Sequence, residues 1–155
     1  MSNRFAICIV GPICSGKSTL AERISVELNI PYLTETMFDN GLMELLDHLD
    51  DYDRVIIEHC SLLNFHDRIT KHFTLISVVY IQISEDLMQA HIQQRIAKGG
   101  TGDFILIDPI EMKQEIEKAI SMLPEKTSLW IMRINSDKDY PVETERILLE
   151  LRNFL

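Results

Sequence analysis

The chain has 155 residues, of which 46% are apolar and 25% charged, with five prolines and six glycines. This composition is typical of one compact domain and excludes a low-complexity or disordered protein. Fifteen lysines and arginines against 24 aspartates and glutamates give a formal net charge of −9, which disfavours binding to nucleic acid through the overall electrostatic field.

Cysteine usage and hydropathy indicate where such a chain works. The three cysteines form an odd set without C-x-x-C spacing, which fits a reducing compartment better than a disulfide framework or a zinc site. The N-terminus lacks a signal pattern, and no apolar run approaches the ~20 residues needed to cross a bilayer. We therefore expect a cytoplasmic protein with no membrane partner.

Strand-like and helix-like segments alternate along the chain. Apolar, β-branched runs predict strands at residues 5–10, 32–33, 55–57, 75–83 and 129–134. Apolar residues at helical spacing predict helices over residues 20–28, 38–49, 112–123 and 147–154. Alternation of this kind predicts an α/β fold with a mainly parallel sheet, whose ligands bind beyond the carboxyl ends of the strands.

The first predicted strand leads into the sequence GPICSGKS at residues 11–18, a G-x-x-x-x-G-K-S motif followed by a predicted helix. Gly11 and Gly16 permit tight backbone angles, and the loop's N–H groups with the helix N-terminus can surround phosphate oxygens. Lys17 would neutralise the β- and γ-phosphates of ATP, Ser18 would offer its hydroxyl to Mg²⁺, and Thr19 would contact the α-phosphate.

The predicted ATP contacts of this loop are Gly11, Pro12, Ile13, Cys14, Ser15, Gly16, Lys17, Ser18 and Thr19. Cys14 is interpreted as a small filler, because phosphate binding uses the backbone of the loop. It could nonetheless be alkylated.

The whole pattern resembles the P-loop kinases of small molecules, a group that includes nucleoside, nucleoside-monophosphate, shikimate and polynucleotide 5′-hydroxyl kinases. The resemblance covers almost all of the chain. It implies one domain, residues 1–155, with a three-layer P-loop NTPase fold in which helices flank a five-stranded, mainly parallel sheet and a small helical lid covers residues 95–108. The guanine signature N-K-x-D of switch GTPases does not occur.

The second strand is followed by LTETMFDN, residues 33–40. The resemblance implies that an acid just past this strand accepts the proton of an attacking hydroxyl, and Glu35 matches by position. Its neighbours do not reproduce the E-P pair of deoxyribonucleoside kinases, so Asp39 is a second candidate base. Glu35 could equally be an N-terminal helix charge next to a Thr34 or Thr36 cap.

The third strand ends in RVIIEHCSLL, residues 54–63, where an acid follows three apolar residues. Burying that acid is costly unless a cation meets it, and Mg²⁺ on the donor phosphates would do so. The stretch resembles the E-R-S motif of deoxyribonucleoside kinases: Glu58 matches the glutamate near the metal, while His59 and Cys60 replace the arginine and serine. Glu58 could instead be a strand-end salt-bridge partner or the catalytic base, and His59 an acceptor contact.

A predicted helix with a glycine-rich tip, residues 85–104, follows the fourth strand. Arg95 matches the lid arginine of small-molecule kinases and, with Lys98, would stabilise charge on the transferred phosphoryl group. The alternative is a solvated helix end whose cations favour the C-terminal dipole. After the last strand, residues 135–140 are expected to contact the base of ATP, with Asn135 and Asp137 among them.

The acceptor distinguishes the functional hypotheses. A carboxylate base favours an alcohol, because a phosphate acceptor is already ionised at neutral pH. We therefore expect an ATP- and Mg²⁺-dependent kinase of a hydroxyl on a nucleoside or similar small molecule. A monophosphate kinase would need several arginines, and only Arg54, Arg68 and Arg95 are expected near the ligand edge.

Two further alternatives remain. A hydroxyl on DNA or RNA, either a 5′-OH or a hydroxymethylated base, would need a basic groove, for which Arg54, Arg68, Lys71 and His72 are candidates. A non-enzymatic nucleotide-binding regulator is the other alternative. A homodimer is compatible with the sequence, which shows no apolar stripe that decides it.

Overall fold

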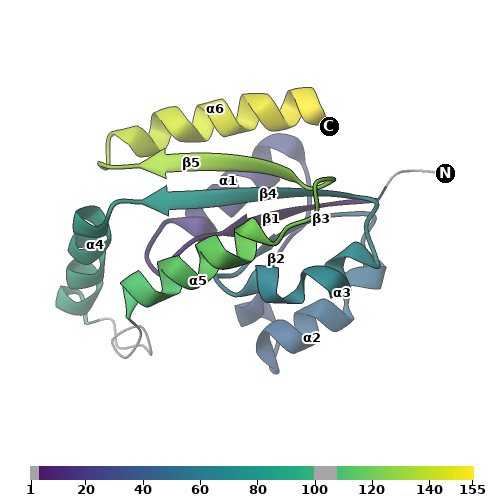
Figure 1. The fold of residues 1–155 in the computed structure, drawn as a ribbon, viewed down its shortest axis with the longest axis horizontal. Coiled ribbons are helices and arrows are strands. Elements are labelled where there is room, and N and C mark those ends of the chain that lie inside the picture. The colour runs from purple at the N-terminus through teal and green to yellow at the C-terminus, as the bar shows by residue number, and fades with distance from the viewer. Residues whose placement is uncertain (1–3, 100–107) are drawn as a thin grey trace.

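The protein is built around one parallel β-sheet (Figure 1). The structure, a computed structural model, describes residues 4–99 and 108–155. Five strands pair in the order β2-β3-β1-β4-β5, and every pairing is parallel. Their bounds are Phe5–Val10 (β1), Tyr32–Thr34 (β2), Arg54–Glu58 (β3), Leu75–Ile83 (β4) and Ser128–Ile134 (β5). The predicted α/β class and all five predicted strands are confirmed.

Helices cover both faces of the sheet and give three layers (Figure 1). α1 (Lys17–Leu28) and α6 (Asp139–Phe154) pack on one face, as one core cluster shows. α2 (Gly41–Asp47), α3 (His66–Thr70) and α5 (Pro109–Ser121) pack on the other face, in a second cluster. α4 (Glu85–Ala97) lies at the carboxyl end of β4, and the short 3₁₀ helices are η1 (Glu35–Met37), η2 (Leu49–Asp51) and η3 (Leu62–Phe65).

Strand β1 is central and buried on both faces. Ile7 and Ile9 belong to the core beneath α1 and α6, whereas Ala6, Cys8 and Val10 belong to the other core. This alternation is why a continuous apolar run predicts the strand correctly. Burial raises the pKa of the Cys8 thiol to about 12, so this thiol is inert at neutral pH.

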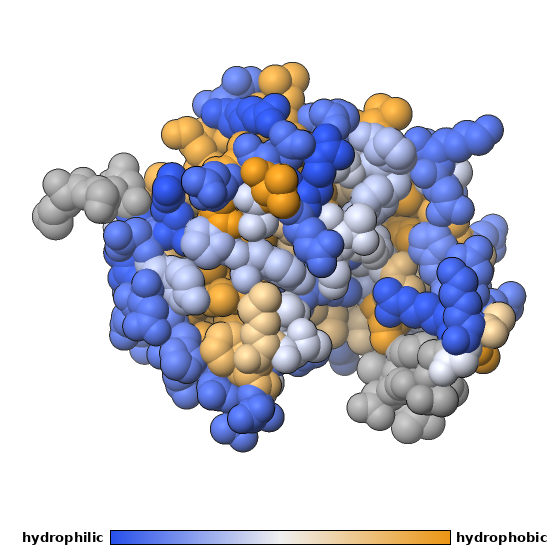
Figure 2. Space-filling view, turned by 180° about the vertical axis from the view of Figure 1, so that it is seen from behind, coloured by the Kyte–Doolittle hydropathy of each residue, from blue (hydrophilic) through white to orange (hydrophobic). Residues whose placement is uncertain are grey.

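Ion pairs join the two helices of one face on their outer side. Arg23 of α1 pairs with Glu145 of α6, and Arg152 of α6 pairs with Glu27 of α1. The view from behind shows polar side chains over most of the surface, with apolar side chains in separate patches between them (Figure 2). None of the described helices combines the length and the apolarity needed to cross a membrane.

Glycines lie at the boundaries of two predicted helices. The helix expected over residues 38–49 begins only at Gly41, since Phe38 is extended and Gly41 has φ 64°, and it is followed by the separate 3₁₀ helix η2. The helix expected before the glycine-rich tip is α4, which ends at Ala97, and Gly99 follows with φ 79°. Most of the expected lid, residues 100–107, lies outside the described residues.

Helix α6 provides a test of the packing. Leu148 is fully buried against the sheet, whereas its neighbour Leu149 is 59% exposed. Leu148→Ala should lower the free energy of unfolding by about 2–5 kcal/mol, because it leaves a cavity in the core. Leu149→Ala should change it by about 0.5 kcal/mol or less. Chemical denaturation measures both values, and equal losses would contradict the assignment of the buried face.

Candidate active site

The G-x-x-x-x-G-K-S segment forms the turn between β1 and α1, and is called the phosphate loop below (residues 11–18). Gly16 precedes α1 with φ 92°, and a Cβ there would lie 2.7 Å from the ring of Tyr140. A Cβ on Gly11 would lie 2.6 Å from Ser15 Oγ. Both glycines are therefore required by space, and Gly16 also by its left-handed backbone.

Lys17 begins α1 and folds back over the loop, where its Nζ donates to the carbonyl of Pro12 at 2.8 Å. Burial lowers the pKa of Lys17, while the nearby Cys60 and Glu58 act in the opposite direction. The first N–H groups of α1 have no partner within the helix and point out of its N-terminus. The loop thus concentrates positive charge at one spot, as an anion site requires.

Glu58 connects three segments of the site. It is the last residue of β3 and is only 8% exposed. Its carboxylate accepts hydrogen bonds from Ser18 Oγ at 3.2 Å and from Thr34 Oγ1 at 3.0 Å. Since Ser18 belongs to the first turn of α1 and Thr34 ends β2, the carboxylate holds both elements beside the phosphate loop. The predicted metal residues Ser18 and Glu58 are thus in direct contact.

Glu35 and His59 form a second polar contact at the same edge. Glu35 directly follows β2, and its Oε2 lies 2.9 Å from His59 Nε2. The other ring nitrogen of His59, Nδ1, accepts the backbone N–H of Ser61 at 2.9 Å. The Glu35 side chain is 47% exposed, whereas that of His59 is 15% exposed. The other candidate base, Asp39, lies in the exposed turn before α2.

A cavity of about 230 Å³ adjoins the phosphate loop under the last turns of α4. Arg95 and Lys98 line this cavity next to the loop. Burial raises the pKa of the Cys14 thiol, and the positive charges of Arg95 and Lys17 partly offset this effect. The lining residues of the cavity are Cys14, Gly16, His91, Gln94, Arg95 and Lys98. The predicted lid arginine thus faces the space next to the loop, as a nucleotide contact requires.

The segment after β5 reaches the loop through contacts that the sequence did not predict. His91 of α4 lies between the Cys14 carbonyl, 3.1 Å from Nδ1, and the carboxylate of Asp137, 2.8 Å from Nε2. The backbone N–H of Asn135 donates to Asp139. His91 therefore links the Asp137 carboxylate to the loop, and Asn135 lies in the same turn after β5 as Asp137.

Tyr140 supports the phosphate loop. Its hydroxyl donates to the carbonyl of Gly16 at 2.6 Å, and burial raises its pKa to about 12. Tyr140 lies in the segment expected to contact the base of ATP, but its ring packs on Gly16 instead. The feature of the sequence that indicates this contact is Gly16, whose lack of a side chain leaves room for a ring from another segment.

The expected basic residues are arranged differently from the prediction. Arg54 begins β3, so it lies at the amino edge of the sheet, opposite Glu58, and its expected place at the ligand edge is wrong. Arg68 pairs with Asp47 at 2.8 Å, and His72 pairs with Asp50. Because Arg68 and His72 each contact an aspartate and Arg54 is at the far edge, these residues do not form the expected basic groove.

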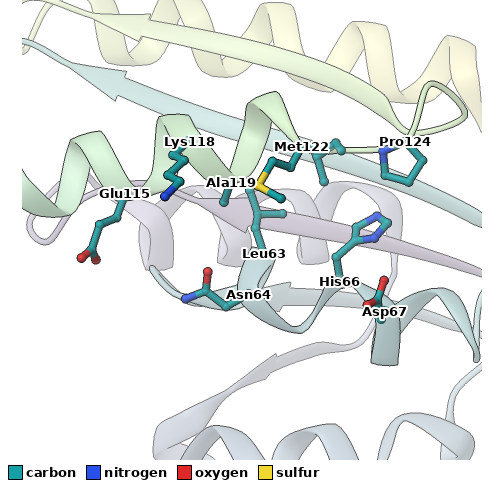
Figure 3. A pocket seen from close by; sticks show the side chains of 10 residues that line it. Leu63, Asn64, His66, Asp67, Glu115, Lys118, Ala119, Met122 and Pro124 are labelled. Atoms are coloured by element: carbon teal, nitrogen blue, oxygen red, sulfur yellow. The ribbon is translucent and has the colours of Figure 1, made fainter.

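A cavity of about 570 Å³ lies between η3–α3 and α5 (Figure 3). Side chains of Leu63, Asn64 and His66 face Glu115 and Met122 across it. It shares residues such as Leu63 and Asn64 with a smaller cavity bounded by Cys60 and Ser61, which follow His59. Open space on this face therefore reaches Cys60 and Ser61 in the segment that follows β3.

Removing the Tyr140 hydroxyl should weaken the support of the loop. Tyr140→Phe loses one hydrogen bond to Gly16, so the Kd for ATP should rise about two- to tenfold while the fold is kept. Tyr52→Phe, on the segment before β3, serves as the control and should leave the Kd unchanged. Calorimetric titration measures both, and equal affinities would contradict a supporting role.

Comparison of the sequence with protein-family models and with curated proteins gives no match. Solved structures do match in fold. A candidate kinase from Chloroflexus aurantiacus J-10-fl superposes with a TM-score of 0.72 at 18% identity, covering 99% of this chain and 100% of that chain. Deoxyadenosine kinase from M. mycoides, solved with bound dATP, has a TM-score of 0.66 at 15% identity, covering 95% and 99%.

A more distant neighbour is shikimate kinase from Bacteroides thetaiotaomicron, with a TM-score of 0.54 at 16% identity, covering 96% of this chain and 98% of that chain. Each match covers almost the whole length of both chains, so the likeness extends over the entire layered sheet. The chain therefore has the fold of the P-loop small-molecule kinases.

Proposed function

We propose that this protein is an ATP-dependent kinase that transfers the γ-phosphoryl group to a hydroxyl of a nucleoside or a similar small molecule. The observation that carries the proposal is the arrangement of two carboxylates at the phosphate loop. Glu58 is buried and bonded to Ser18, while Glu35, next to Thr34 on the same network, is accessible to a substrate. One acid is thus suited to the metal and the other to the acceptor.

The residues at the loop fit a Mg²⁺–nucleotide complex. Ser18 Oγ and the Glu58 carboxylate are hard oxygen donors, which Mg²⁺ prefers, directly or through its waters. Among the described residues, no group bonds the buried Ser15 Oγ inside the loop. When bound, Mg²⁺ neutralises charge on the donor phosphates. Ser18 and Glu58 would hold it, and Lys17 would contact the phosphates.

The proposed nucleotide position uses the remaining predicted contacts. The loop residues 11–19 would enclose the phosphates, with Arg95 and Lys98 over them. Asn135 and Asp137 would face the base, since His91 links Asp137 to the loop and Asn135 belongs to the same turn. Exclusion of water by the segment expected as a lid, residues 95–108, would favour transfer over hydrolysis. Residues 1–155 would work as one kinase domain.

In the proposed reaction, Glu35 accepts the proton of the acceptor hydroxyl while the oxygen of that hydroxyl attacks the γ-phosphorus. The new O–P bond forms while the bond between the γ-phosphorus and the β–γ bridging oxygen breaks, which releases ADP. Lys17 and Arg95 would stabilise the charge of the transferred group. The cavities beside Cys60, Ser61 and Asn64 offer space for the rest of the acceptor.

The alternatives receive less support. A monophosphate acceptor needs a cluster of arginines, yet Arg54 lies at the far edge and Arg68 is paired with Asp47. The same placement weakens a nucleic-acid acceptor. A regulator without transfer would not need an accessible acid at the loop. A cytoplasmic location and a homodimer stay predictions.

Transfer from γ-labelled ATP with Mg²⁺ to three acceptor pools tests the proposal. The pools are mixed nucleosides, mixed nucleoside monophosphates, and DNA with free 5′-OH ends or hydroxymethylated bases. Label in the nucleosides is the expected result. Label in DNA alone or in the monophosphates alone would replace the proposed acceptor, and phosphate release without any labelled acceptor would favour a regulator.

Lys17→Ala should reduce transfer by at least about 100-fold, because the variant loses the cation that meets the phosphates. The fold should remain, since burial lowers the pKa of Lys17 and its charge is therefore costly in the folded state. Lys126→Ala, in the turn before β5, is the control. Near-normal turnover of Lys17→Ala would refute the role of the loop.

Glu58→Gln should raise the Mg²⁺ concentration for half-maximal transfer by about tenfold or more. The amide keeps the shape and one acceptor oxygen for Ser18 or Thr34, so the fold should persist. The Tm of the protein should be higher with ATP and Mg²⁺ than with ATP alone, and this difference should be smaller for Glu58→Gln than for the native protein. Glu125→Gln, in the turn before β5, is the matched control, and an unaltered magnesium titration would count against Glu58.

A further inference from the structure

We propose that His59 is a positioning residue that fixes the carboxylate of Glu35 for proton transfer. The inference deepens the proposed function and rests on it, because it concerns the base of the same reaction. It is carried by a chain of hydrogen bonds that runs from the backbone of Ser61 through the imidazole to Glu35.

The hydrogen bonds define the direction of this chain. Ser61 N–H is a donor, so the Nδ1 atom that receives it at 2.9 Å must offer a lone pair. The imidazole proton is therefore on Nε2, which lies 2.9 Å from Glu35 Oε2. His59 thus donates to the carboxylate, and Ser61 determines which ring nitrogen does so.

The backbone holds His59 more firmly than Glu35. The His59 N–H donates to the carbonyl of Ile9 at 3.2 Å, which extends the pairing of β3 with β1 by one residue. The His59 carbonyl accepts from Leu62 N–H at 3.4 Å. Glu35, by contrast, begins a 3₁₀ helix and has a largely exposed side chain. The fixed ring therefore orients the freer carboxylate.

This arrangement leaves the base ready to act. Oε2 of Glu35 is occupied by His59, so Oε1 remains to receive the proton of the acceptor hydroxyl. The bond to Nε2–H can persist after that transfer, because a carboxylic acid keeps an acceptor oxygen. Since the Glu35 side chain is 47% exposed, the proton can then pass to solvent and restore the carboxylate.

Two substitutions separate the contacts of the imidazole. His59→Gln places an amide N–H near the position of Nε2, so it keeps a donor for Glu35 and loses the acceptor for Ser61. His59→Asn places an amide oxygen near the position of Nδ1, so it keeps the acceptor for Ser61 and loses the donor for Glu35. Both variants have similar polarity, which makes each the control for the other.

With the acceptor pool that takes label, His59→Asn should lower kcat about ten- to hundredfold and leave KM for ATP unchanged, because only orientation of the base is lost. His59→Gln should stay within about threefold of the native kcat. In a Glu35→Gln background, His59→Asn should have almost no further effect, since two groups that act as a unit are not additive.

Equal falls in kcat for the two His59 variants would overturn the positioning role. The same would follow if His59→Asn lowered kcat as much in the Glu35→Gln background as it does in the native protein. An unchanged rate for Glu35→Gln alone would instead overturn the proposed base. If a His59 variant fails to fold, ¹⁵N spectra of the native imidazole decide. A protonated Nε2 whose shift responds to Glu35→Gln is expected, and a protonated Nδ1 would contradict the inference.

Discussion

A carboxylate buried at the end of a strand is stable only if hydrogen bonds or cations surround it, and the site is organised by this constraint at Glu58. Ser18 and Thr34 meet the requirement. Because Lys17 precedes Ser18, Glu35 follows Thr34 and His59 follows Glu58, these three neighbours are brought together by the same hydrogen bonds. Parallel pairing of β1, β2 and β3 makes the arrangement possible, since it places the ends of all three strands at one edge.

The two faces of the sheet divide the work of the proposed reaction. On the face of α1 and α6, Tyr140 and His91 support the phosphate loop from segments that are distant in sequence. On the other face, cavities between η3, α3 and α5 reach Cys60 and Ser61 in the segment after β3. A nucleotide donor and an acceptor could therefore approach the same strand ends from different sides, without competing for one pocket.

Local sequence patterns account for much of this architecture. The strands, most helices and the phosphate loop depend on residues close in sequence, so periodicity and the glycine pattern predict them. The contacts of Glu35 with His59 and of Tyr140 with Gly16 join residues 24 and 124 positions apart, and no local pattern reveals them. The misplacement of Arg54 had a different cause: a residue that begins a strand lies at the edge opposite the strand's end, and strand direction alone would have shown this.

The support of Gly16 by Tyr140 also bears on how the chain acquires its nucleotide site during synthesis. The phosphate loop is made early, but the ring that packs on it leaves the ribosome only after all five strands have been synthesised. A nascent chain therefore has the glycine-rich turn before it has the ring that supports it. A ligand that binds the supported loop better than the unsupported one would stabilise the finished fold more than any earlier intermediate.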